Sequence, residues 1–348
     1  LVVLDWFKDW IGYPASASGL LLSGGSSANM VGVACARAQL AAHEYSRAVL
    51  YWSAESHSSV AKAARILGFP LDRVRVLPAD AQRRLPIDGL AQAVAEDRAR
   101  GLVPLVVIAN AGTTSTGAID ELSELAQFTR QHSLWLHVDA AYGGFVVLTE
   151  RGRAWLRGIA DADSITLDPH KWLYQPFEVG CLLVREGARL DRAFHHMPDY
   201  LQDTAIAGRE VNFADRGYQL TRSARAIKIW LSVQYFGLER FRSAIDQSLD
   251  LAAYADTRLQ RMEQFEILSG VHLGIVCFRR RSPGADENAL ENLNLALTRQ
   301  LADSGEGMIS STRIGGKYAL RFCIMNHRTT RADVDRVIDF LARGSASP

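Results

Sequence analysis

Short apolar segments alternate with helical stretches between residue 25 and about residue 185, and this alternation constrains the fold more than any other feature of the chain. The helical pattern is clearest in SSANMVGVACARAQLAAHEY. The apolar segments are RAVLYWS, RVRVLPA, PLVVIANAG, WLHVDAAY, SITLD and VGCLLVR. Such alternation is typical of a mostly parallel sheet that is covered by helices on both faces. We therefore expect an α/β fold whose ligands bind at the carboxyl ends of the strands.

The pattern changes after this region. Residues 195–217, HHMPDYLQDTAIAGREVNFADRG, are polar and long for a connection. We therefore expect this segment to be a lid that covers a binding site. A helical stretch follows from about Ser223 to Tyr254. Two strand candidates, HLGIVCFRRR and KYALRFCIMN, come next, with helices predicted at 285–303 and 330–343. We expect a large α/β domain and a smaller α+β domain, which span residues 1–232 and 233–348.

Composition and charge exclude several classes of protein. The chain is 48% hydrophobic and 22% charged, which is typical of a folded globular protein. Its net charge of +1 and the lack of long runs of one sign argue against nucleic-acid or anionic-membrane partners. No apolar run approaches the roughly 18 residues that span a bilayer, and no signal peptide is evident. The cysteines lie in apolar segments without a CxxC pair, which favours a reducing, cytoplasmic location; they are Cys35, Cys181, Cys277 and Cys323.

Three of the apolar segments end in polar side chains that a buried strand does not require. WLHVDAAYGG places Asp139 at the end of a buried strand, NAGTTSTGAID contains Thr114, and SITLDPHKW places Lys171 beside His170. Each also has an ordinary structural interpretation. Asp139 could cap a turn or helix, Thr114 could belong to a hydroxyl-rich loop, and Lys171 could extend its amine to solvent along an apolar stem.

A fourth feature lies upstream, where SGGSSANMVGVACAR joins a glycine-serine turn to the start of a helix. The first turn of a helix exposes N–H groups that suit a phosphate, although the same pattern also forms ordinary N-caps. Neither a GxGxxG nor a Walker motif is present. The chain also lacks HExxH and GxSxG motifs and metal-ligand spacing of its histidines, so we expect neither a metal site nor serine hydrolysis.

The four features together indicate pyridoxal phosphate. The aldehyde of this cofactor forms a Schiff base with a lysine, its ring nitrogen needs a carboxylate partner, and its phosphate binds at a helix N-terminus. A carboxylate that keeps the ring protonated lets the ring withdraw electrons from the α-carbon of a bound amino acid. The sequence therefore predicts a pyridoxal-dependent enzyme that acts on a small molecule.

HVDAAYGG followed by DPHKW resembles the group II pyridoxal-dependent amino-acid decarboxylases, and in particular the aromatic-L-amino-acid decarboxylase branch. The similarity continues through SAESHSSVAKAARILG, NAGTTSTGAID, MPDYLQD, LTRSARAIKIW and LGIVCFR, and covers essentially the whole chain. It implies a fold-type I transferase-like architecture and a homodimer with active sites at the subunit interface. The sequence starts after an amino-terminal helical segment that family members carry, so we expect a fragment or a pocket that is completed differently.

The resemblance also implies roles for individual residues. Lys171 would bind the cofactor aldehyde, and Asp139 would pair with the ring nitrogen. His57 would lie against one face of the ring, although the residue alone could equally be a helix cap or a core histidine. Ala141 would pack on the opposite face, where its small side chain allows close approach.

Further contacts follow from the same resemblance. Gly25 and Ser26 would bind the phosphate, with His170 within reach of it, and Thr114 would lie near the ring hydroxyl or the substrate carboxylate. Asp168 departs from the asparagine of many relatives. An anion beside a phosphate is repulsive unless it is protonated or paired, but we include Asp168 as a contact.

Tyr200 matches a tyrosine of the mobile loop that would return a proton to the α-carbon after carbon dioxide leaves. The resemblance thus implies decarboxylation of an L-amino acid to its amine, with an aromatic substrate such as tryptophan, tyrosine, phenylalanine or DOPA. No pocket residue identifies the aromatic side chain. Decarboxylation of an acidic or diamino acid is therefore an alternative, as are an aldehyde synthase, an aminotransferase and a non-catalytic remnant.

Overall fold

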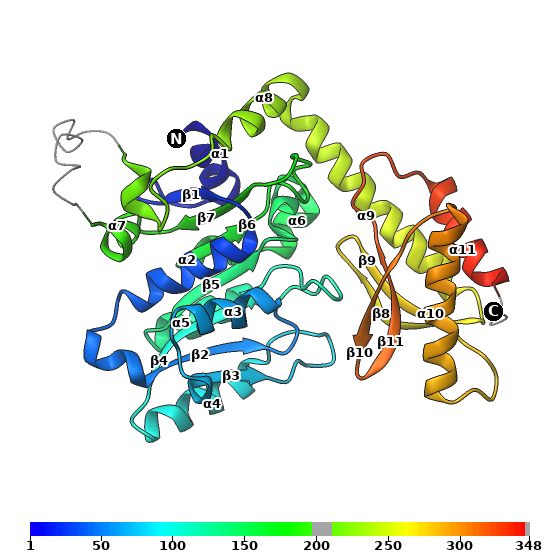
Figure 1. Ribbon diagram of the computed structural model, residues 1–348, viewed down its shortest axis with the longest axis horizontal. Coiled ribbons are helices and arrows are strands. Elements are labelled where there is room, and N and C mark those ends of the chain that lie inside the picture. Colours follow the sequence, from blue (N-terminus) through cyan, green and yellow to red (C-terminus); the bar gives the residue numbers. More distant parts are fainter. Residues whose placement is uncertain (197–210, 345–348) are drawn as a thin grey trace. The chain divides into compact units, whose positions relative to one another are not determined.

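The computed structural model describes residues 1–196 and 211–344, which form two compact units (Figure 1). The first unit comprises Leu1–Ala111 and Ile119–Gly237. The second comprises the short segment Gly112–Ala118 and the chain from Leu238 onward. The predicted boundary near residue 232, between a cofactor-binding domain and a small domain, stays a prediction.

The helical stretch predicted for residues 223–254 is divided into two helices at Gly237. Gly237 has a φ of 73°, a backbone conformation that favours glycine, and it separates two helices. These are α8 (Ala226–Phe236) and α9 (Leu238–Gln260). The prediction of continuous helix is therefore wrong at this position, because glycine at a helix C-terminus stops the helix.

Seven strands form the sheet of the first unit, in the order β1-β7-β6-β5-β4-β2-β3. The strands from β6 to β3 pair in parallel, whereas β7 is antiparallel to both of its neighbours. This confirms the mostly parallel sheet, and all six predicted segments are strands. The sequence analysis did not predict β1, which has only five residues. The strands are β1 (Ser18–Leu22), β2 (Ala48–Ser53), β3 (Val74–Leu77), β4 (Val103–Asn110), β5 (Trp135–Ala140), β6 (Ser164–Leu167) and β7 (Gly180–Val184).

Helices connect these strands, as the alternating pattern predicts. The α-helices that precede α8 are α1 (Val2–Ile11), α2 (Gly25–Arg37), α3 (Ser58–Ile66), α4 (Ile87–Ala99), α5 (Leu122–Gln131), α6 (Glu150–Trp155) and α7 (Ala188–Phe194). Short 3-10 helices span Ala42–Arg47, Leu71–Arg73, Gly144–Leu148, Ile159–Asp161 and Phe213–Arg216. Every residue of β2, β5, β6 and β7 is buried, as expected for strands that are covered on both faces.

Helix α2 runs across the sheet and lies closest to β5, β6 and β7 (Figure 1). A glycine on α2 makes this approach possible. A Cβ atom at Gly32 would lie 2.6 Å from Cε1 of His137, which is closer than carbon atoms pack. The same face of α2 also carries Ala28 and Ala36, which are both buried. Small side chains thus bring the helix backbone against the centre of the sheet.

The second unit has a four-stranded antiparallel sheet in the order β10-β11-β9-β8. Its strands are β8 (Phe265–His272), β9 (Ile275–Arg280), β10 (Ser310–Ile314) and β11 (Lys317–Cys323), and its later helices are α10 (Glu287–Ser304) and α11 (Arg331–Arg343). The sequence predicted β9, β11 and both helices. It missed β8 and β10, whose residues are mostly half-buried or exposed and so lack an apolar pattern.

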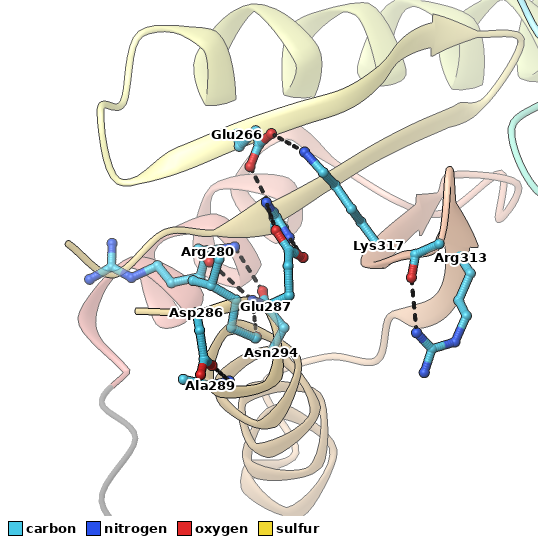
Figure 2. Close-up of polar contacts among 11 residues, drawn as sticks. Glu266, Arg280, Asp286, Glu287, Ala289, Asn294, Arg313 and Lys317 are labelled. Atoms are coloured by element: carbon cyan, nitrogen blue, oxygen red, sulfur yellow. Dashed lines mark hydrogen bonds and ion pairs between the residues drawn. The ribbon is translucent and has the colours of Figure 1, made fainter. Parts of the chain in front are cut away.

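Apolar side chains from α9, α10 and α11 form one core with the strands of this second sheet. Leu259, Leu297 and Ile338 are fully buried there, each from a different helix. Burial of a side chain of this size contributes about 1.5–3 kcal/mol. In the same unit, Lys317 reaches Glu266 at 3.4 Å (Figure 2).

No helix within residues 1–196 and 211–344 is both long and apolar enough to cross a membrane. Three cysteines are buried as predicted, namely Cys35, Cys181 and Cys277, while Cys323 is half-buried. Burial raises the pKa of the Cys35 thiol to about 12. This thiol is therefore protonated at neutral pH and packs as a small apolar side chain.

Candidate active site

Two of the three polar residues predicted at strand ends, Asp139 and Lys171, lie at the ends of neighbouring strands. Asp139 lies near the carboxyl end of β5 and is in register with Thr166 of β6. Lys171 follows the end of β6 after a short turn, in which its backbone N–H donates to the carbonyl of Asp168. Because β5 and β6 are parallel, both ends lie at the same edge of the sheet.

Asp168 is the partner of the lysine. Nζ of Lys171 lies 3.2 Å from Oδ2 of Asp168, and Nε2 of His170 lies 3.6 Å from the same oxygen. Asp168 is only 3% exposed, whereas the side chain of Lys171 is 33% exposed. Burial raises the pKa of Asp168, and the charges of Lys171 and His170 act in the opposite direction. The carboxylate that seemed repulsive in the sequence is thus paired with the amine of Lys171 and lies near the ring of His170.

The N-terminus of α2 lies over this pair. The helix begins at Gly25, and no side chain caps it. A Cβ atom at Gly25 would lie 2.9 Å from Oδ2 of Asp168 and 3.0 Å from Cβ of Ala141, so glycine leaves the space that these two residues need. The next residue, Ser26, is exposed. An uncapped helix N-terminus of this kind suits a negatively charged group.

His170 and His57 occupy different surroundings. A Cβ atom at Gly24 would lie 3.5 Å from Cε1 of His170, so this ring is next to the start of α2. His57 is the N-cap of α3, and its Nδ1 accepts a hydrogen bond from the backbone N–H of Ser59 at 3.2 Å. The capping role considered for His57 is therefore present. The residue as a whole is nevertheless exposed.

The structure leaves two of the predicted roles untested. Thr114 is exposed on the segment Gly112–Ala118, which belongs to the second compact unit. In that unit the neighbouring Ser115 accepts a hydrogen bond from Oγ1 of Thr312 at 3.1 Å. Tyr200 lies outside the described residues. The roles of Thr114 and Tyr200 stay predictions.

The sequence analysis missed a polar residue on α2 that contacts the candidate site. Asn29 is 1% exposed, and its Nδ2 donates to Oδ2 of Asp139 at 2.8 Å and to Oγ of Ser59 at 2.9 Å. Its Oδ1 lies 3.0 Å from Nε2 of His137, which is fully buried within β5. The sequence did contain a signal for Asn29, which is the one amide side chain among the small and apolar residues of α2. A buried amide needs hydrogen-bond partners, so such a residue indicates a polar contact inside the fold.

Burial gives His137 a pH-dependent effect on stability. It lowers the pKa of His137 from 6.5 to about 4, against the smaller opposing effect of the Asp139 charge. Between these values the unfolded chain binds more protons than the folded chain, so acidification favours unfolding. We expect His137 alone to lower the free energy of unfolding by about 2 kcal/mol between pH 7 and pH 5.

Urea unfolding of the wild-type chain and His137→Gln at both pH values measures this contribution. The variant is expected to be less stable at pH 7, because it loses buried hydrogen bonds, and to lose less stability on acidification. His43→Gln, at an exposed position, is the matched control. Equal pH dependence in the wild-type chain and His137→Gln would contradict the assignment.

The groups at this edge of the sheet fit pyridoxal phosphate. Asp139 is 7% exposed and accepts from Ala141 N at 3.1 Å and from Asn29 Nδ2 at 2.8 Å. A carboxylate has about four lone-pair sites, so Asp139 can also accept from a protonated ring nitrogen. The amine of Lys171 is accessible, and the start of α2 suits a phosphate. The fold and this edge are those of the fold-type I enzymes that use pyridoxal phosphate.

Comparison with known proteins agrees with this class. The pyridoxal-dependent decarboxylase conserved domain matches residues 1–281. An aromatic-L-amino-acid decarboxylase of Bacillus atrophaeus is 39% identical over 341 residues, which cover 97% of this chain and 71% of that protein. An L-2,4-diaminobutyrate decarboxylase of Rhizobium meliloti is 34% identical over 327 residues, with 94% and 66% coverage. The chain belongs to the pyridoxal-dependent decarboxylase family.

A solved structure extends the similarity to three dimensions. The structure of Oryza sativa TDC with PLP and tryptamine superimposes with a TM-score of 0.93 at 27% identity, and the match covers 98% of this chain and 74% of that one. The chain is therefore an amino-acid decarboxylase that depends on pyridoxal phosphate. Within residues 1–196 and 211–344, no cluster of three or more His, Cys, Asp or Glu side chains is arranged to hold a metal ion.

Proposed function

We propose that the enzyme decarboxylates an aromatic L-amino acid to the corresponding amine and carbon dioxide. The observation that carries this proposal is the similarity to the aromatic-L-amino-acid decarboxylase, at 39% identity over 97% of the chain. The diaminobutyrate decarboxylase is less similar, at 34%. Tryptophan, tyrosine, phenylalanine and DOPA are the substrates that we expect.

The cofactor would be held by groups at the edge of the first sheet. Lys171 would bind it through Nζ, and Asp139 would pair with its ring nitrogen. The backbone and hydroxyl groups of Gly25 and Ser26 would bind its phosphate, with His170 beside them. When bound, pyridoxal phosphate supplies an electron-withdrawing ring that stabilises the charge left at the α-carbon as carbon dioxide departs.

The remaining residues would orient the reacting groups. Asp168 would keep the amine of Lys171 at the sheet edge, as its 3.2 Å contact with Nζ suggests. His57 and Ala141 would lie on opposite faces of the ring. Thr114 would lie near the ring hydroxyl or the substrate carboxylate, and the hydroxyl of Tyr200 would return a proton to the α-carbon.

The enzyme would act as a homodimer with active sites at the subunit interface. Helix α8 supports this proposal, because its large apolar side chains are exposed, including Ile227, Trp230, Leu231, Tyr235 and Phe236. An exposed apolar group of this size is typical of a surface that binds another protein chain. We also place the enzyme in the cytoplasm, on the basis of its cysteines, which lie in apolar segments without a CxxC pair.

Product analysis with a panel of amino acids tests the proposed reaction. The purified chain, loaded with pyridoxal phosphate, is incubated with aromatic, acidic and diamino acids. We expect amine and carbon dioxide from the aromatic substrates, with kcat/KM at least about tenfold above that for glutamate or diaminobutyrate.

Each other outcome identifies a different function. Preference for an acidic or diamino acid would contradict the aromatic assignment. Aldehyde with ammonia and peroxide would indicate a synthase, and a keto acid would indicate an aminotransferase. No product from any amino acid would indicate a remnant without catalytic activity.

A further inference from the structure

The neighbours of Asn29 determine which way its amide points. Nδ2 faces Oδ2 of Asp139 at 2.8 Å, and Oδ1 faces Nε2 of His137 at 3.0 Å. The reversed amide would set Oδ1 against the carboxylate, and both groups only accept hydrogen bonds. The carboxylate of Asp139 therefore keeps the NH₂ group of Asn29 on its own side.

This orientation determines the hydrogen positions deeper in the sheet. Because Oδ1 of Asn29 only accepts, Nε2 of His137 carries the ring hydrogen. Nδ1 of His137 then accepts from Oγ of Ser164 at 2.7 Å, and Ser164 accepts from Nε1 of Trp135 at 2.8 Å. An indole N–H only donates, so this row of hydrogen bonds runs in one direction from Trp135 to Asp139. The low pKa of His137 agrees with a neutral ring.

The second hydrogen of the Asn29 amide connects Asn29 to His57 through the hydroxyl of Ser59. Nδ2 of Asn29 donates to Oγ of Ser59 at 2.9 Å, and that oxygen lies 2.7 Å from Nδ1 of His57. The backbone N–H of Ser59 donates to the same Nδ1 at 3.2 Å. Nδ1 of His57 is thus an acceptor. Oγ of Ser59 accepts from Asn29 and donates to this Nδ1, so the orientation of the Asn29 amide determines the orientation of the His57 ring.

We propose that Asn29 is a positioning residue that holds Asp139 and His57 together through the two hydrogens of one amide. This inference rests on the proposed function, in which Asp139 pairs with the ring nitrogen of the cofactor and His57 lies against the ring face. Asn29 itself is buried and acts through these two residues. Partners of this kind fix the side chains that touch a cofactor, and their loss weakens binding and catalysis.

Asn29→Ala tests the proposal, with Asn294→Ala as the matched control. Asn294 is also fully buried and makes three hydrogen bonds, to the N and O atoms of Arg280 and to the carbonyl of Leu290 (Figure 2). It belongs to the second compact unit. Both variants should therefore lose similar stability, but Asn29→Ala alone should change the site.

Two readouts use the bound cofactor. We expect Asn29→Ala to weaken the affinity for pyridoxal phosphate about tenfold, since a hydrogen bond to a charged group is lost. We also expect the pH at which the absorbance of the bound cofactor changes to move by about one unit. Asn294→Ala should keep both values within about twofold and 0.2 units of the wild type.

A third readout needs no cofactor. Nitrogen-15 NMR of histidine-labelled chain reports which ring nitrogen of His137 carries hydrogen. We expect only Nε2–H in the wild type and in Asn294→Ala, and a mixture in Asn29→Ala. Detection of Nδ1–H as the main form in the wild type would overturn the hydrogen-bond network. Because this readout does not depend on cofactor binding, it distinguishes a failure of the network from a failure of the proposed function.

Ser59→Ala distinguishes the branch from Asn29 to His57 from the branch to Asp139. It also replaces Asn29→Ala as the test if that variant does not fold. It interrupts only the branch to His57, so we expect a several-fold weaker cofactor affinity, unchanged absorbance pH and unchanged His137 hydrogen position. Cofactor affinity within about twofold of the wild type in both Ser59→Ala and Asn29→Ala would overturn the proposal. A stability loss without change in the site would make Asn29 a structural residue only.

Discussion

Replacing Lys171 with alanine is expected to abolish the visible absorbance of the bound cofactor and to lower decarboxylation about a thousandfold or more. The chain has only five lysines, so few amines could substitute. Lys8 pairs with Asp5, and Lys317 pairs with Glu266. Absorbance spectra and rates of carbon dioxide release measure the effect.

Lys62→Ala is the control for this variant. Lys62 is exposed on α3, away from the strand ends, so its loss should leave absorbance and rate unchanged. If Lys171→Ala kept the spectrum and rate of the wild type, the assignment of Lys171 would be wrong.

Asp139→Asn has the second largest expected effect. The neutral amide cannot hold a protonated ring nitrogen by charge, and its NH₂ group would meet the N–H groups of Asn29 or Ala141. We expect kcat to fall about 10²- to 10³-fold, as when other groups that stabilise transition-state charge are removed. The KM should change far less, because Asp139 does not contact the amino-acid side chain in this proposal. Steady-state kinetics with an aromatic substrate measure both.

Asp163→Asn is the matched control for the carboxylate. Asp163 also lies beside β6, but it precedes the strand and accepts from the backbone N–H of Leu136 at 2.8 Å. Burial raises its pKa, and this half-buried acid lies at the other end of the strand. We expect lower stability with little change in kcat. A kcat of Asp139→Asn as high as that of Asp163→Asn would contradict the role of Asp139.

The sequence was sufficient to expect two polar strand ends at one edge of the sheet. Asp139 and Lys171 each follow an apolar run, and parallel strands bring such ends together. The same logic identified the first turn of α2 as a place for an anion. These predictions needed only the period of the strands and the direction of the chain.

The partners of these residues could not be read from the sequence. Asn29 bonds to Ser59, His137 and Asp139, which are 30 to 110 positions away, and no local pattern reports such distances. Asp168 looked unfavourable because its pairing with Lys171 depends on the turn between them. The role of Thr114 stays a prediction, because its segment belongs to the second unit, where Ser115 bonds to Thr312.

Two of the strands that the sequence missed, β8 and β10, share a physical cause. Strands β8 and β10 are half-exposed, so burial imposes little alternation on their side chains. The stop at Gly237 depends on a single positive φ within a long helical pattern. Both features are set by contacts and backbone conformation more than by hydrophobic period.

Peptide mapping after borohydride reduction tests the central claim most directly. The wild-type chain is mixed with pyridoxal phosphate, reduced and digested, and the modified lysine is identified by mass spectrometry. We expect the label on Lys171 and on none of Lys8, Lys62, Lys228 or Lys317 in stoichiometric amount. A stoichiometric label on one of those four lysines, with Lys171 unmodified, would contradict the proposed site.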